Sequence, residues 1–176
     1  MEGCTEKKNV GIAMIFRERN GKIGLSKLQR NIISELSITL KDKLVEKDGI
    51  IVFENAGITY AISRMPVGIP KEDFESALNY SVLFINKENV ASKQSAHIIV
   101  SVISKPNTII ENQLILTKFV RAIIKSTITL GVYWGSAIHL IQSDIYIDLT
   151  NEIADDFLPI PIWVNTDDKE VLRMEM

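Results

Sequence analysis

Residues 96–104, AHIIVSVIS, place bulky aliphatic side chains on both faces of a predicted strand. In an extended chain successive side chains alternate between faces, which assigns two sets of aliphatic residues: Ile98, Val100 and Val102 on one face, Ile99 and Ile103 on the other. A strand of this kind at an open sheet edge would invite pairing with other chains. We therefore expect residues 96–104 to lie inside a sheet, with a neighbouring strand on each side.

Hydrophobic periodicity and turn residues place the other elements around this strand. Before it we predict a strand at 9–16 that is apolar on both faces, a helix at 26–44, strands at 49–54 and 58–65, and a helix at 71–84. After it we predict a helix at about 109–127, a strand at 130–140, a short helix near 150–157 and a last short strand at 159–165.

Local signals refine three of these boundaries. Ser26 with Gln29, and Thr108 with Glu111, have the spacing of a capping box, in which two side chains satisfy the free N–H groups at a helix start. The NAG sequence at 55–57 predicts a hairpin, because Gly57 can adopt a positive φ at the turn.

The first six elements run β-α-β-β-α-β, the order of ferredoxin-like folds. The simplest version of that fold leaves the strand after the second helix at an edge, which conflicts with the apolar faces of 96–104. We therefore expect an α+β fold, a ferredoxin-like core extended by an additional helix and one or two C-terminal strands, with 130–140 returning alongside 96–104. The sheet should be covered on at least part of its second face. We expect one domain at 9–168, with polar tails at 1–8 and 169–176.

Charge and cysteine content limit the partners. The 20 basic and 22 acidic residues are interspersed, so there is no basic stripe of the kind that nucleic acid binding requires. The single cysteine, Cys4, allows no disulfide within the chain and suits a reducing cytoplasm. No apolar run predicts an export signal or a membrane span. We expect a soluble cytoplasmic protein with no nucleic acid and no membrane partner.

The stretch LGVYWGSAIHL at 130–140 is the strongest candidate for a site. As one strand it puts Trp134 on a bulky, buried face. The opposite face carries Tyr133, Gly135, Ala137 and His139, with a depression at its small residues. Either a helix packs into this depression or a ligand occupies it as a groove. Tyr133 and His139 would stand about 20 Å apart, so a shared ligand must be elongated unless a bulge at Gly135 brings them closer.

Catalytic motifs are weak. G-x-S-x-G is absent around Ser136, and neither phosphate-binding glycine motif occurs in the chain. His97 and His139 suit either a hydrogen-bonded structural role or an acid–base or metal site. A metal site would also need a carboxylate, and the nominal candidates are Glu54, Asp144 and Asp148. We predict no metal and no cofactor.

Four segments in order, SRMPVGIP, AHIIVSV, GVYWGSA and PIWV, give the chain a resemblance to a family of uncharacterised bacterial proteins, domain of unknown function 4261. The resemblance spans roughly residues 10–165, and its most specific part is GVYWG at 131–135. It implies a bacterial, soluble, intracellular protein and supplies no activity or catalytic residue. Similar proteins continue with another glycine-containing stretch, whereas this sequence stops after NTDDKEVLRMEM, as a short member or a fragment would.

These observations favour a non-catalytic cytoplasmic binding or interaction domain that engages an unknown protein partner or self-associates, for instance through a sheet edge. The alternative is a small-molecule enzyme or a metal-dependent hydrolase that uses His97 or His139 with a nearby carboxylate. A ferredoxin-like scaffold does not decide between them, because it hosts many unrelated activities.

Overall fold

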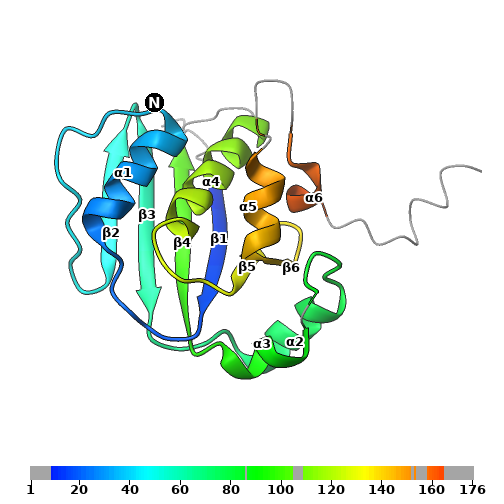
Figure 1. Ribbon diagram of the computed structural model, residues 1–176. Helices are drawn as coiled ribbons and strands as arrows, with labels where there is room; N and C mark the ends of the chain where they lie inside the picture. The colour runs from blue at the N-terminus through cyan, green and yellow to red at the C-terminus, as the bar shows by residue number, and fades with distance from the viewer. Residues whose placement is uncertain (1–8, 86, 105–108, 152, 154–157, 165–176) are drawn as a thin grey trace, which may run out of the picture.

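A computed structural model describes residues 9–85, 87–104, 109–151, 153 and 158–164, which form an α+β fold around one antiparallel sheet (Figure 1). The strands are β1 (Asn9–Arg17), β2 (Ile50–Asn55), β3 (Ile58–Met65), β4 (Ala96–Ser104), β5 (Gly131–Trp134) and β6 (His139–Gln142). The helices are α1 (Leu25–Leu36), α2 (Lys71–Asn79), α3 (Lys87–Lys93), α4 (Ile109–Ile124), α5 (Ser143–Asn151) and α6 (Ile160–Trp163). The expected tails at 1–8 and 169–176 lie outside the described residues.

The strand order is β2-β3-β4-β1-β5-β6. β4 lies between β3 and β1, so the prediction that 96–104 is an interior strand is confirmed. A ferredoxin-like core is not confirmed, because the order of the strands differs and the sheet extends further. The expected pairing of 130–140 with 96–104 is wrong: β4 already has a neighbour on each side, and β5 pairs with the free side of β1.

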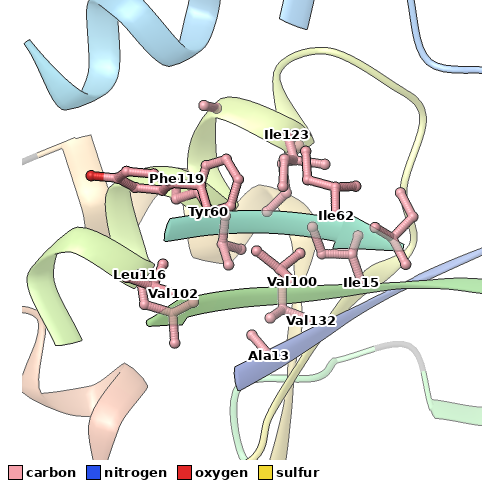
Figure 2. Close-up of a cluster of buried hydrophobic side chains, with 14 of the residues drawn as sticks. Ala13, Ile15, Tyr60, Ile62, Val100, Val102, Leu116, Phe119, Ile123 and Val132 are labelled. Atoms are coloured by element: carbon pink, nitrogen blue, oxygen red, sulfur yellow. The ribbon is translucent and has the colours of Figure 1, made fainter. Parts of the chain in front are cut away.

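One face of the sheet, called the covered face below, holds the main core. Side chains from β1, β3, β4 and β5 point from it toward α4, and Figure 2 shows Ile15, Ile62, Val100 and Val132 in this layer with Phe119 of the helix. Helices α1, α4 and α5 lie on the same side of the sheet in Figure 1. All five of these side chains are fully buried, and burial of each contributes about 1.5–3 kcal/mol of hydrophobic stabilisation.

The second face is covered only at one end. Phe16 of β1 meets Phe74 of α2 edge to face, with ring centroids 5.1 Å apart, and Phe84 and Leu140 complete this smaller core. Partial covering of the second face is thus confirmed. The strand predicted at 9–16, apolar on both faces, is β1, but it is buried on both faces only toward its C-terminal end, because Val10 and Ile12 are exposed.

The first helix differs from its predicted boundaries. It ends at Leu36, where Ser37 takes a left-handed conformation with φ 53°, so 38–44 is not helical. The capping box of Ser26 and Gln29 is wrong, because Gly24 is the N-cap and makes no side-chain cap bond. The Gln29 side chain instead accepts a hydrogen bond from the main-chain N–H of Leu44 at 3.1 Å. It therefore fixes the loop that follows the helix.

The β2–β3 hairpin has the predicted turn. Gly57 has φ 79° and Ala56 has φ 49°, the pair of positive values that a two-residue turn of the primed type requires. The strand pairing runs from Ile50 with Ser63 to Asn55 with Ile58.

Three later predictions need correction. The helix predicted at 71–84 ends at Asn79 and is followed by the short α3, so Val82 lies outside it and is exposed. The short helix near 150–157 begins earlier, as α5, while 152 and 154–157 lie outside the described residues, as does the Thr108 cap. The strand at 159–165 is instead the single-turn helix α6, since Pro161 cannot donate a ladder hydrogen bond but fits a helix start.

Candidate functional site

The stretch 130–140 is a hairpin, so its interpretation as one strand is wrong. β5 ends at Trp134, which pairs with His139 of β6. The N–H of Ala137 donates to the carbonyl of Trp134 at 3.2 Å and closes the turn between them. Tyr133 and His139 are therefore much closer than an extended strand would place them.

The hairpin distributes the four predicted groove residues over two faces and a turn. Tyr133 lies on the second face, partly buried against the α2–α3 core. His139 lies on the covered face, where it is buried opposite Trp134. Gly135 and Ala137 belong to the turn. They do not line one face as the sequence interpretation required, and ligand binding by these residues stays a prediction.

The two histidines lie on opposite faces of the sheet. His97 pairs with Phe16, whose side chain is in the second-face core, whereas His139 is aligned with covered-face residues through Trp134 and Ala13. The Nδ1 atom of His97 is 2.8 Å from the carbonyl oxygen of Val67, and its side chain is buried. This contact fits the structural role, and the two imidazoles cannot serve one reacting centre.

Two of the three carboxylates named as metal ligands have hydrogen-bond partners elsewhere. Glu54 accepts a hydrogen bond from the Thr59 hydroxyl at 3.1 Å, and Asp144 accepts one from the N–H of Ile145 at 2.8 Å. Asp148 lies on α5 and is exposed. Within the part of the chain that the structure describes, no group of three or more His, Cys, Asp or Glu side chains could hold a metal ion.

Trp134 belongs to the core, as predicted. Its side chain is 0% exposed, and its ring centroid is 6.3 Å from that of Tyr146 on α5. Gly131, at the other end of β5, has a role that sequence reasoning missed. A Cβ there would lie 2.4 Å from the Phe16 side chain and 2.6 Å from the carbonyl oxygen of Ile141, so any side chain at this position would clash with them.

A polar cavity of about 760 Å³ lies between α3 and the start of α5. Lys87 and Lys93 line it on one side, and Asp144 and Ser143 on the other. The Ser143 hydroxyl is 2.7 Å from the Thr129 hydroxyl rather than beside a base. The described lining offers polar contacts of both signs to a small molecule but no pair of a nucleophile and a base.

The uncovered part of the second face, called the open face below, consists of three rows across β2, β3, β4 and β1. Each row is written in the strand order β2, β3, β4, β1. The row nearest the β2–β3 turn is Glu54, Thr59, Ile103 and Val10. The middle row is Val52, Ala61, Ser101 and Ile12, and the third row is Ile50, Ser63, Ile99 and Met14. None of the twelve is buried, and exposure reaches 57% at Val52 and 47% at Ile12. Only Glu54 among them is ionisable.

The β6 edge of the sheet carries a covering segment, and the β2 edge is paired at one end. On β6 the N–H of Leu140 donates to the Ser81 hydroxyl at 2.6 Å, and the N–H of Gln142 donates to the carbonyl of Leu83 at 3.0 Å. On β2 the main chain of Ile50 pairs with Lys47. The loop 39–45 stands beside β2 across a groove of about 560 Å³. The described apolar surface that suits a large partner is the open face.

No protein-family model matches this chain, and no significant match was found among curated proteins or solved structures. Among the residues in the described ranges, no helix has the length and apolar character to cross a membrane.

Proposed function

We propose that this chain is a non-catalytic interaction domain that binds a protein through its open face. The observation that carries the proposal is the composition of that face, in which eleven of twelve solvent-accessible positions are uncharged. The largest exposed apolar patch on a monomeric protein is often its functional surface.

The site chemistry supports binding over catalysis. The histidines face opposite sides of the sheet, and the Ser143 hydroxyl in the polar cavity contacts another hydroxyl. The alternative, a small-molecule enzyme or a metal-dependent hydrolase that uses His97 or His139 with a nearby carboxylate, stays a prediction. We further propose a bacterial, cytoplasmic setting and membership of the domain of unknown function 4261 family, supported by the single Cys4 and the GVYWG segment.

Site-specific photo-crosslinking in the cells of origin tests this proposal. A photoreactive phenylalanine analogue replaces Ile12 on the open face or, as the matched control, Ile128, which is 76% exposed in the α4–β5 connection. We expect an adduct of one discrete mass from position 12 and none from position 128. Absence of a discrete adduct from positions 12, 52 and 101, or the same adduct from position 128, would overturn the proposal.

A further inference from the structure

We infer that the partner of the open face is a second copy of this chain, in a two-fold dimer that places Val52 of one copy opposite Ile12 of the other. This inference rests on the proposed function, because it names the occupant of the same face. Three properties of the face carry it: its charge, the order of its side-chain sizes, and its area.

The open face carries little charge that would repel a second copy. In a two-fold contact each residue meets the same surface patch, so any strong charge on the patch would oppose itself. The open face has one ionisable residue, Glu54, and it lies at the corner formed by β2. The whole chain has a formal net charge of −2, so repulsion between copies is small.

The two central strands of the open face, β3 and β4, differ in the size of their side chains. β3 contributes only small side chains, from Thr59, Ala61 and Ser63. Its neighbour β4 contributes isoleucines at both ends, Ile103 and Ile99. A two-fold axis parallel to the strands, running between β3 and β4, sets each β3 opposite the β4 of the other copy. Large side chains then meet small ones.

The same axis aligns the outer strands. Rotation about an axis parallel to the strands keeps the height of each row, so the middle row of one copy faces the middle row of the other. β2 then lies opposite β1, and Val52 faces Ile12 twice, once on each side of the axis. Ala61 and Ser101 at the centre allow the sheets to approach closely, near the usual spacing of about 10 Å.

The size of the face predicts a weak dimer. Four strands about 4.8 Å apart and three rows spanning about 20 Å give a planar footprint of about 400 Å² per copy, or about 800 Å² in total. Contacts below about 1,200 Å² belong to transient associations. A two-fold contact uses the same patch on both copies, so assembly closes at two copies.

Charge-swap variants test both the occupant and the geometry. Sedimentation equilibrium over a wide concentration range gives the average mass of wild type, Ile12→Lys, Val52→Glu and an equimolar mixture of the two variants. We expect the wild-type mass to rise from one chain toward two. Each single variant should dimerise at least about tenfold more weakly, because it sets an unpaired charge against an aliphatic side chain.

The mixture is the decisive sample. In a heterodimer the new lysine faces the new glutamate, and the second Val52–Ile12 contact is unchanged, so we expect dimerisation to return and to weaken with added salt. The matched controls Ile128→Lys and Val164→Glu change exposed aliphatic residues off the open face and should dimerise like wild type. Thermal melts of the four variants should show that each is folded.

Three results would overturn the inference: a wild-type chain of single mass at every concentration, single variants that dimerise like wild type, or a mixture that does not regain dimerisation. Photo-crosslinking separates this failure from that of the proposed function. An adduct of position 12 with twice the mass of one chain supports the inference. A discrete adduct with a different protein overturns the second-copy inference and keeps the interaction domain, whereas absence of any adduct overturns both.

Discussion

The two faces of one sheet are built from the same strands but differ in what covers them. On β4, Ile98 points into the layer beneath α4 and is fully buried, whereas the next residue, Ile99, lies on the open face and is partly exposed. Helices α1, α4 and α5 enclose the first face, and α2 and α3 reach only one end of the second. Aliphatic character alone therefore does not make a core: the covered face stabilises the fold, and the open face leaves its aliphatic side chains exposed.

The largest expected effect comes from removing a covered-face aromatic. Trp134→Ala should destabilise the protein by about 3–5 kcal/mol, because the side chain is fully buried against Tyr146 and its loss leaves a cavity. Urea unfolding followed by circular dichroism measures the change. A variant that unfolds like the wild type would mean that Trp134 is solvent-exposed, and the division between the two faces would fail.

Gly131→Ala tests the packing at the covered end of the second face. The new Cβ would press on the Phe16 ring and on the carbonyl oxygen of Ile141, and the latter cannot rotate away. We expect a loss of about 1–3 kcal/mol, the usual range for overpacking. Gly21→Ala is the control, since its Cβ would make only an ordinary contact with the Arg17 side chain, at 3.5 Å. Equal stability losses in both variants would contradict tight packing at Gly131.

A covered-face tyrosine should make stability depend on alkaline pH. Burial raises the pKa of the Tyr146 hydroxyl well above its usual value near 10, so the folded state disfavours ionisation. Stability is then complete below about pH 10 and falls at higher pH as the unfolded chain ionises first. Burial also raises the pKa of Tyr60, which adds a contribution of the same sign.

Tyr146→Phe isolates this contribution. At pH 7 the variant should lose about 1 kcal/mol with the hydrogen bond that the hydroxyl donates to the Thr117 carbonyl at 3.1 Å. Above pH 10 its stability should fall less steeply than that of the wild type. Urea titrations at pH 7 and 10.5 measure both quantities. Equal losses of stability in the two proteins above pH 10 would contradict a raised pKa of the Tyr146 hydroxyl.

The smallest effect is expected on the open face. Ile12→Ala should change the stability of the monomer by no more than about 0.5 kcal/mol, because the side chain is already half exposed. Ile15→Ala, three residues along the same strand and fully buried, should cost about 2–5 kcal/mol. Measurement at a concentration where the chain is monomeric keeps dimer dissociation out of the comparison. Similar losses at both positions would place Ile12 in a core.

Local pattern was enough to predict most elements and the interior position of β4. The alternation at 96–104 identifies a strand buried on one face and apolar on the other, and Gly57 marks the hairpin turn. Local pattern did not predict which strands lie next to each other in the sheet. The choice of β1 as the neighbour of β5 depends on β4 having both sides occupied, a property of the whole sheet that no single segment encodes.

The candidate site was harder to predict for a similar reason. The hairpin at 135–138 requires Ile138 at φ 51°, a conformation that β-branched residues rarely adopt, so its sequence reads as a continuous strand. The open face could not be predicted from the sequence. Val10 and Ile12 are typical of a buried strand, and they are exposed because α2 and α3 cover only the other end of the second face. Gly131, a glycine at the start of a strand, is a sequence signal of close packing. The residue that packs against it, Phe16, is far away in the sequence, so the contact could not be predicted.

Hydroxyl-radical footprinting at two protein concentrations tests whether the open face is exposed in a single chain and covered by a second copy. At a dilution where the chain is monomeric, we predict strong labelling of Ile12 and Val52 and none of Ile15. At a concentration where the mass doubles, both open-face residues should be protected, while Ile128 stays labelled. Protection of Ile12 and Val52 already at high dilution, or equal labelling of both residues at the two concentrations, would contradict the account.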